Sequence, residues 1–225
     1  MGLIALFAVA RLALSGRAFA AGHREAPALP ALRTYLDTLI VVGLVALLLV
    51  VFVIRTYYID SISMIPTLQV GDVFLIDQLD YHLRAPRDGE IAVFKPPVPS
   101  GGNGFIKRII GAPGDAIRIS GGIVYRNGHP LTEPYENQPP SYDLAIRNYT
   151  IYVNGAALQP AQADIPPRGK WQSPDHIPDG FYFMLGDNRN YSDDSHVWGF
   201  VPRSSFGGRA FMIIWPLSRF SILHS

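Results

Sequence analysis

A run of seventeen uncharged and almost wholly apolar residues dominates the N-terminal part of the chain. Residues 38–54 read TLIVVGLVALLLVVFVI and are bounded by an aspartate and an arginine. A helix over this run is roughly 26 Å long, close to the thickness of a bilayer core. No polar face interrupts it, and Tyr57 and Tyr58 follow where an interfacial aromatic belt would lie. The pattern favours a transmembrane helix over residues 37–58; a buried core helix is the alternative.

The flanking charges predict the orientation of this helix. Residues 1–36 carry four arginines and one glutamate, whereas Arg55 is the only basic residue close to the other end. Because basic residues gather on the cytoplasmic side, we expect residues 1–36 in the cytoplasm and residues 59–225 outside it. Residues 1–15 are apolar but short and interrupted by an arginine. A weak second span, an interfacial helix and the h-region of a signal sequence, with an A-x-A pattern at residues 18–20, stay open for this segment.

The composition excludes several classes of protein. Hydrophobic residues make up 48% of the chain and charged residues 16%, which excludes a disordered protein. Nineteen Lys and Arg against eighteen Asp and Glu leave no basic excess, so we expect no nucleic-acid partner. The chain has no cysteine, which excludes disulfides, Cys-ligated zinc and thiol nucleophiles.

The part of the chain after the apolar run predicts a mostly β domain. Residues 55–225 contain seventeen Gly and seventeen Pro, a density that long helices rarely tolerate. Two runs with Asn-Gly turns, residues 123–131 and 149–158, each predict a hairpin. Short β-branched and aromatic runs predict further strands: DVFLID at 72–77, EIAVFK at 90–95, FIKRIIG at 105–111, AIRIS at 116–120, FYFML at 181–185 and RAFMIIW at 209–215.

The stretch between residues 134 and 178 is rich in Pro, Asn, Gln and Asp. We expect it to form a loop-rich extension outside the core, within a loop-rich insertion at about residues 120–180. The fold class that follows is an antiparallel β-sheet domain with a loop-rich extension, on a single N-terminal transmembrane helix.

Two serines lie shortly after the apolar run. The segment SISMIPTL at residues 61–68 places Ser61 and Ser63 two residues apart, so that one could be a nucleophile and the other a hydroxyl donor to an oxyanion. Taken alone, the segment favours a serine-rich turn beside the membrane over a nucleophile site. An extended linker would keep Ser63 within roughly 30 Å of the membrane edge, where substrates emerge from the bilayer.

A lysine lies within an apolar strand pattern at residues 105–115, FIKRIIGAPGD. Strand alternation places Lys107 on one face with Phe105 and Ile109. Such a lysine is either an edge residue whose amine reaches solvent or a desolvated amine. Desolvation lowers the pKa of an amine, as a lysine general base requires.

A polar loop, LGDNRNYSDDSHVWG, follows an apolar strand at residues 185–199. Its aspartates do not have the spacing of an EF-hand, so we expect no metal site. A loop cross-linked by Arg189 and the neighbouring carboxylates is the structural interpretation.

The serine segment, the lysine strand and the polar loop follow a membrane anchor in an order that resembles the type I (leader) signal peptidases. The matching patterns are S-x-S-M-x-P-T-L, then G-D, then I-K-R-x-x-G-x-P-G-D, then G-D-N-R-x-x-S-x-D-S. The resemblance covers about residues 57–199 and implies a serine endopeptidase with a Ser/Lys dyad. In that dyad Ser63 would be the nucleophile and a neutral Lys107 the general base. The Ser61 hydroxyl and the Ser63 N–H would form the oxyanion hole, and Ser192 would orient the lysine by a hydrogen bond.

The resemblance also implies how the substrate is held and where it is cut. Shallow pockets for small side chains would be lined by Ile59, Met64, Val93 and Ile106. The polar loop would be supported, through salt bridges, by Asp187, Arg189, Asp194 and His196. The substrate would be a membrane-inserted preprotein with small residues at −1 and −3, cleaved through an acyl-enzyme without a metal or organic cofactor. The location would be a bacterial inner membrane, because enzymes of the endoplasmic reticulum use His in place of Lys.

Three positions depart from the family pattern. Position 62 is Ile where a small or polar residue is usual, and position 60 is Asp where Pro is frequent. His196 stands where an arginine is usual, and a histidine supports Asp194 fully only while it is protonated. Two alternatives stay open: a Ser/Lys maturation peptidase with one dedicated client, of the conjugal-transfer type, and a non-catalytic membrane-anchored β-domain.

Overall fold

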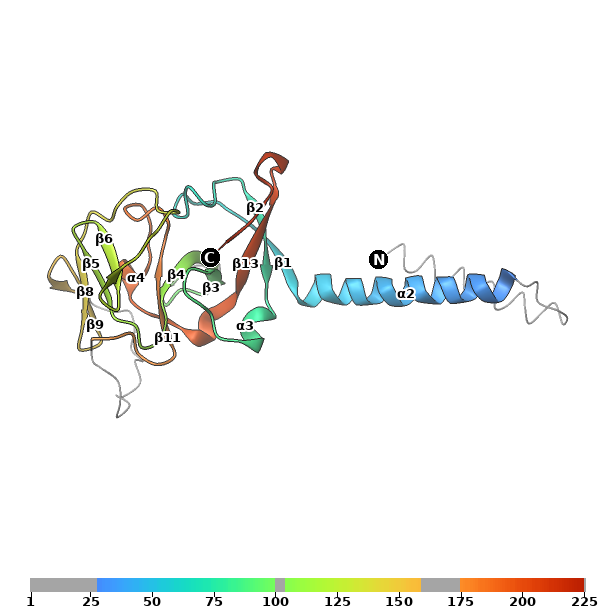
Figure 1. Ribbon diagram of the computed structural model, residues 1–225, viewed down its shortest axis with the longest axis horizontal. Helices are drawn as coiled ribbons and strands as arrows, with labels where there is room; N and C mark the ends of the chain where they lie inside the picture. Colours follow the sequence, from blue (N-terminus) through green and yellow to red (C-terminus); the bar gives the residue numbers. More distant parts are fainter. Residues whose placement is uncertain (1–27, 100–103, 159–174, 225) are drawn as a thin grey trace. The chain divides into compact units, whose positions relative to one another are not determined.

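The computed structural model describes residues 28–99, 104–158 and 175–224 (Figure 1). The chain divides into two units, Met1–Ile54 and Arg55–Ser225. The first contains helix α2, Ala28–Phe52. Within the described parts of the chain, no helix combines the length and the apolar content that a membrane crossing requires.

Helix α2 begins and ends earlier than the predicted segment of residues 37–58. Ala and Leu favour helix at its start, and Pro30 lies in the first turn, where a missing N–H is tolerated. Beyond its end, Ile54–Tyr58 form strand β1 instead of a last helical turn. The sequence IRTYY is β-branched and aromatic, and β1 pairs with β2.

The second unit is built on an eight-stranded sheet, and every strand pair whose register is described is antiparallel. Its order is β1-β2-β13-β3-β4-β11-β12, with β14 paired to β13. The strands are β1, β2 (Val73–Asp77), β3 (Ile91–Phe94), β4 (Phe105–Gly111), β11 (Phe181–Leu185), β12 (Val201–Pro202), β13 (Phe206–Trp215) and β14 (Ser221–Ile222). Five of the predicted strands lie in this sheet, and the sixth, at 116–120, lies in a second sheet.

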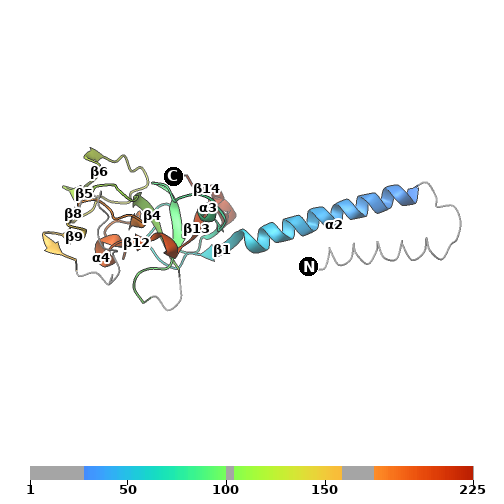
Figure 2. The same cartoon turned by 90° about the horizontal axis from the view of Figure 1, so that it is seen from below.

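The second sheet has the order β10-β9-β8-β5-β6-β7, and its strands lie beyond β4 and β11 on the side away from β1 (Figures 1 and 2). Both predicted hairpins are present in it, and their Asn-Gly turns have the positive φ angles of a type I′ turn. Its strands are β5 (Ile117–Ser120), β6 (Ile123–Arg126), β7 (His129–Pro130), β8 (Leu144–Arg147), β9 (Thr150–Val153) and β10 (Ala156–Ala157).

The expectation that residues 134–178 lie outside the core is wrong for their central part. Leu144 and Ile146 on β8 and Ile151 on β9 are buried in a hydrophobic cluster with Ile119. Strand β8 was missed because only four residues separate Asp143 from Asn148, too few for alternation to be evident.

Strand β4 lies at the centre of the domain and contributes to three hydrophobic clusters. Ile110 belongs to the cluster shared with the second sheet, Ile106 packs against the cluster around β2, and Ile109 belongs to the cluster around Trp198. Packing on several sides fixes the backbone of β4, and with it the position of Lys107. Short helices complete the described fold: α3 (Asp80–Leu83), α4 (Ser195–Trp198), η1 (Arg203–Ser205) and η2 (Leu217–Arg219).

Candidate active site

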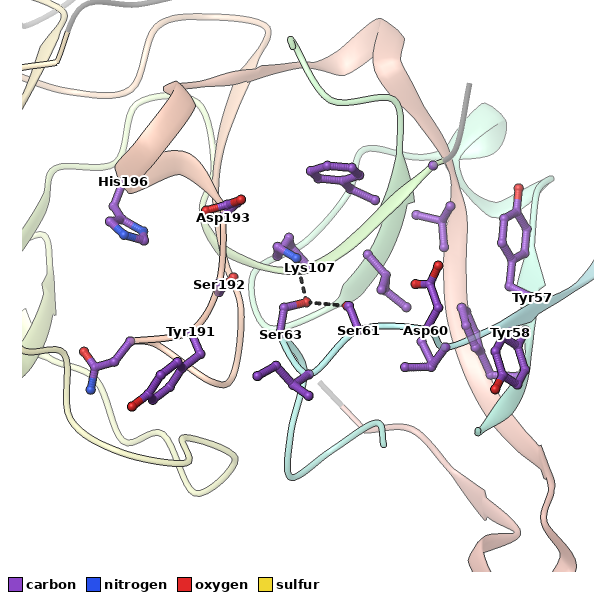
Figure 3. Close-up of a pocket in the computed structure, with 18 residues that line it drawn as sticks. Tyr57, Tyr58, Asp60, Ser61, Ser63, Lys107, Tyr191, Ser192, Asp193 and His196 are labelled. Atoms are coloured by element: carbon purple, nitrogen blue, oxygen red, sulfur yellow. Dashed lines mark hydrogen bonds between the residues drawn. The ribbon is translucent and has the colours of Figure 1, made fainter. Parts of the chain in front are cut away.

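Ser63 and Lys107 lie in direct contact although 44 positions separate them in the chain. Lys107 Nζ donates a hydrogen bond of 2.8 Å to Ser63 Oγ (Figure 3). Both residues are buried, with exposed fractions of 6% for Ser63 and 5% for Lys107. The first two motifs predicted from the sequence therefore meet in one place.

Core packing and backbone hydrogen bonds position these two side chains. Lys107 lies mid-strand on β4 and pairs with Ala92 of β3. Ser63 lies in the turn after β1, and the two residues that follow it in the core, Met64 and Leu68, are fully buried. The polar loop also holds this turn, because Asn188 N–H donates to the Ser63 carbonyl at 3.1 Å.

Burial lowers the pKa of the Lys107 amine below its ordinary value. The carboxylates of Asp194, Asp193 and Asp187 act in the opposite direction, more weakly than the burial. Burial therefore shifts the protonation equilibrium toward the neutral amine, which is the form that can accept a proton from a hydroxyl.

Two further serines surround the pair, as the sequence predicted. Ser61 Oγ lies 3.2 Å from Ser63 Oγ (Figure 3). Ser192 Oγ is buried beside the same cavity, but among the described residues it has no hydrogen-bond partner. The expected hydrogen bond between Ser192 and Lys107 is thus not formed here, and the Lys107 amine donates to Ser63 instead.

Gly186 allows Ser192 and the Ser63 backbone to approach each other. A Cβ atom on Gly186 would overlap both Ser192 Oγ and the Ser63 carbonyl oxygen. We expect Gly186→Ala to displace these groups and to lower kcat/KM for the peptide cleavage that the motifs imply roughly 100-fold, the size of effect that a 1 Å misplacement can have. Gly207→Ala is the matched control, since its new Cβ would make an ordinary 3.5 Å contact with the Val93 carbonyl. Equal kcat/KM for the two variants would contradict this explanation.

A buried ion pair anchors the start of the polar loop. Asp187 accepts hydrogen bonds from Arg108 Nε at 2.8 Å and Nη2 at 2.7 Å, and both residues are almost completely buried. Thr67 Oγ1 donates a third hydrogen bond to the same carboxylate. The Arg108 guanidinium also lies 3.7 Å from the centre of the Tyr135 ring. The predicted supporting role of Asp187 thus has a partner, Arg108, that the sequence had not identified.

Arg189 is completely buried and binds carboxylates from the inserted segment. Its guanidinium donates two hydrogen bonds of 2.8 Å to Glu133 and one of 3.3 Å to Glu136. Its Nε donates to the Gly186 carbonyl at 3.0 Å. Glu133 therefore belongs to the support of the site, and 56 positions of separation explain why local motifs did not indicate it.

Asp194 and His196 form the contact expected between them. His196 Nδ1 lies 2.6 Å from Asp194 Oδ1, and Asp194 also accepts the Gly186 N–H at 3.0 Å. The His196 ring stacks on Tyr142, with ring centres 4.3 Å apart and planes 12° apart. This stacking on a residue of the insertion is an additional support that only the tertiary structure shows.

A cavity of about 740 Å³ opens beside the Ser63–Lys107 pair (Figure 3). Three of the four residues expected to bind substrate line it: Ile59, Val93 and Ile106. Met64 does not, because its side chain is 1% exposed and packs in the core. Tyr57, Phe74 and Tyr191 line the cavity as well. In residues 28–99, 104–158 and 175–224, no group of three His, Asp or Glu side chains could hold a metal ion.

Comparison with known proteins decides the family. The family model "Signal peptidase, peptidase S26" matches residues 32–215. The chain belongs to this signal peptidase family. A probable signal peptidase I-1 of Synechocystis sp. is 40% identical over 195 residues, which cover 83% of this chain and 85% of the relative. A signal peptidase I of Leptolyngbya laminosa is 38% identical over 174 residues (75% and 72%), and one of Aquifex aeolicus is 31% identical over 219 residues (82% and 84%).

Membership confirms the expected activity. The chain has the function of a signal peptidase I, a serine endopeptidase, and its substrates are preproteins that carry signal peptides. The family is anchored in the plasma or the thylakoid membrane. A non-catalytic β-domain, one of the two alternatives, is therefore excluded.

Proposed function

We propose that Ser63 is the nucleophile and Lys107 the general base with which this signal peptidase cleaves preproteins. The observation that carries the proposal is the 2.8 Å contact between the Lys107 amine and the Ser63 hydroxyl, both buried. Burial lowers the pKa of Lys107, so that the amine can take up the hydroxyl proton.

The reaction then proceeds in two stages. Ser63 Oγ passes its proton to Lys107 Nζ and attacks the carbonyl carbon of the −1 residue. The oxyanion that forms accepts hydrogen bonds from the Ser61 hydroxyl and the Ser63 N–H. Lys107 returns the proton to the leaving amine, which departs as the new N-terminus of the mature protein. Lys107 next deprotonates a water molecule, which hydrolyses the ester and frees Ser63.

Ser192 would assist when Lys107 carries the proton. A buried ammonium needs acceptors, and the Ser192 oxygen lines the same cavity without a partner of its own. In this proposal Ser192 orients the ammonium during the reaction, and the resting enzyme keeps the Ser63 contact instead.

The walls of the cavity fit a small-x-small specificity. In an extended peptide, side chains −1 and −3 point to the same side, so they would both face the apolar wall formed by Ile59, Val93 and Ile106. Aromatic rings of Tyr57 and Phe74 lie on that wall as well and limit its depth. Alanine at −1 and −3 is the residue that such shallow pockets would accept.

We further propose that the enzyme is a single-pass protein of a bacterial inner membrane, with its N-terminus in the cytoplasm and its catalytic domain outside. The uncharged run at residues 38–54 and the arginines before it support this orientation. The β13–β14 segment adds an exposed apolar surface suited to a lipid interface: Trp215, Leu217, Phe220 and Ile222.

The experiment that tests the dyad is cleavage of a preprotein with an Ala-x-Ala site by the full chain in detergent. We expect the wild type to cut after the second alanine, as shown by the mass of the new N-terminus, and Ser63→Ala to have no detectable activity. Ser204→Ala, an exposed serine outside the cavity, is the matched control and should cleave normally. A Ser63→Ala variant with wild-type kcat/KM would contradict the proposal, and cleavage at a different kind of site would contradict the specificity.

A further inference from the structure

Both acidic and basic side chains line the substrate cavity, and its two carboxylates have no hydrogen-bond or ion-pair partner in the described part of the chain. Two carboxylates, Asp60 and Asp193, line it, together with Lys107 and His196. Both aspartates are exposed, and among the described residues neither forms a hydrogen bond or an ion pair. Structural carboxylates of this domain, such as Asp187, instead have arginine partners. The two cavity aspartates are therefore free to interact with a bound molecule.

The cavity is anionic in the form that starts the reaction. A lysine that acts as base is uncharged, so Lys107 does not offset the two carboxylates at that stage. The cavity also contains Ser192 Oγ, whose residue is 7% exposed and which has no partner. An unpaired buried hydroxyl costs free energy unless a ligand or a protonated group uses it, which marks the cavity as a site built for an occupant.

The two aspartates lie on opposite sides of the Ser63–Lys107 pair (Figure 3). Asp60 follows Ile59, which lines the apolar wall for the acyl side of the substrate. Asp193 follows Ser192 and lies on the other side of the pair from Asp60. A substrate whose acyl side runs along the Ile59 wall therefore places its leaving amine toward Asp193. Because the −1 and −3 side chains face the wall, the −2 side chain points away from it into the open part of the cavity, which the exposed Asp60 also lines.

We infer that Asp60 and Asp193 are specificity-determining residues that favour a basic side chain beside the cleavage site and disfavour an acidic one. Asp60 acts on the −2 residue, and Asp193 acts on the first residues of the mature protein. The inference rests on the proposed function of the cavity. Coulomb attraction over about 6–8 Å at a partly exposed site corresponds to roughly three- to tenfold in kcat/KM for each carboxylate.

The test uses six preproteins that differ only at −2 or at +1, with Lys, Gln or Glu at that position. For the wild type we expect kcat/KM to fall in the order Lys, Gln, Glu at both positions. Asp60→Asn should remove the order at −2 alone, and Asp193→Asn should remove it at +1 alone. Asp179→Asn, an exposed carboxylate outside the cavity, is the control and should keep both orders.

The ratio of rates with Lys and Glu substrates is the decisive quantity. Asp193 also raises the pKa of Lys107, so Asp193→Asn changes the rate with every substrate, and the ratio cancels this effect. Equal ratios in the wild type and both variants would overturn the inference, even if the Gln substrates are cleaved as the proposed function requires. The same sequences can also be bound as peptides to Ser63→Ala, and the ratio of Kd values for the Lys and Glu peptides does not depend on catalysis. This ratio tests the inference even if the catalytic proposal fails.

Discussion

Replacing Lys107 with methionine should abolish preprotein cleavage and, at neutral pH, stabilise the fold. Methionine keeps the aliphatic stem that packs on β4 but cannot accept a proton from Ser63. Loss of a general base lowers kcat roughly 10²–10⁴-fold. The buried amine is destabilising in its charged form, so its removal favours the folded state. Loss of activity together with gain of stability distinguishes a catalytic lysine from a structural one.

The stabilisation should depend on pH with a defined sign. The unfolded chain holds the Lys107 proton up to about pH 10.4, whereas the folded protein releases it at lower pH because burial lowers the pKa. Between these two values the unfolded state binds more protons, so the wild-type free energy of unfolding rises with pH. Lys107→Met lacks that rise, and its advantage is largest on the acid side.

Thermal unfolding in detergent between pH 6 and pH 10, with cleavage assays on the same samples, measures both effects. Each 1 kcal/mol corresponds to about 2–4 °C in Tm for a domain of this size. Lys95→Met, an exposed lysine next to β3, is the matched control and should change neither quantity. A Lys107→Met variant that is less stable than the wild type at pH 7 would show that the amine is held as a structural charge.

Asp187→Ala should be the most destabilising single change in the polar loop. It leaves the Arg108 guanidinium, 1% exposed, without a carboxylate partner and without the two hydrogen bonds to it. Removal of one partner from a buried pair costs about 3–5 kcal/mol, because the remaining charge is uncompensated. We expect the Tm to fall by roughly 6–20 °C. Cleavage should fall as well, since the same loop carries Ser192 and the Asn188 N–H that binds the Ser63 carbonyl.

Asp88→Ala provides the matched comparison. Asp88 pairs with Arg126 at 2.8 Å, but both side chains are about a third exposed, and such pairs contribute about 0–1 kcal/mol. A double variant, Arg108→Met with Asp187→Leu, removes both charges and should recover much of the stability lost in Asp187→Ala. Equal Tm values for Asp187→Ala and Asp88→Ala would contradict the central place given to the Arg108 pair.

The strands of the main sheet were predictable because their apolar side chains indicate burial without reference to distant residues. The runs at β3 and β11 are continuous apolar or aromatic segments between turn residues, and the structure buries them on both faces. The Asn-Gly hairpins were predictable for a different reason, since few dipeptides adopt two successive positive φ angles. Strand β8 was missed because its burial depends on partners from β5 and β9.

The candidate dyad was predictable only from ordered motifs, and its support was not. Taken alone, Ser63 could belong to a serine-rich turn and Lys107 could be an edge residue of a strand. Only the occurrence of all three motifs in order favoured a catalytic role for both. The partners Arg108, Glu133 and Tyr142 make contacts across 54 to 79 positions, which no local pattern encodes. Met64 was expected to line a substrate pocket, but its side chain is buried in the core. A position within a catalytic motif can therefore have a packing role.

The most direct test of the dyad is to locate the acyl group on the enzyme. The full chain is mixed in detergent with a p-nitrophenyl ester of a peptide that ends in Ala-x-Ala, quenched in acid and mapped by mass spectrometry. We expect an acyl peptide attached to Ser63 in the wild type and no such modification in Ser63→Ala or Lys107→Met. An acyl group on Ser61 or Ser192, or one that persists in Ser63→Ala, would contradict it.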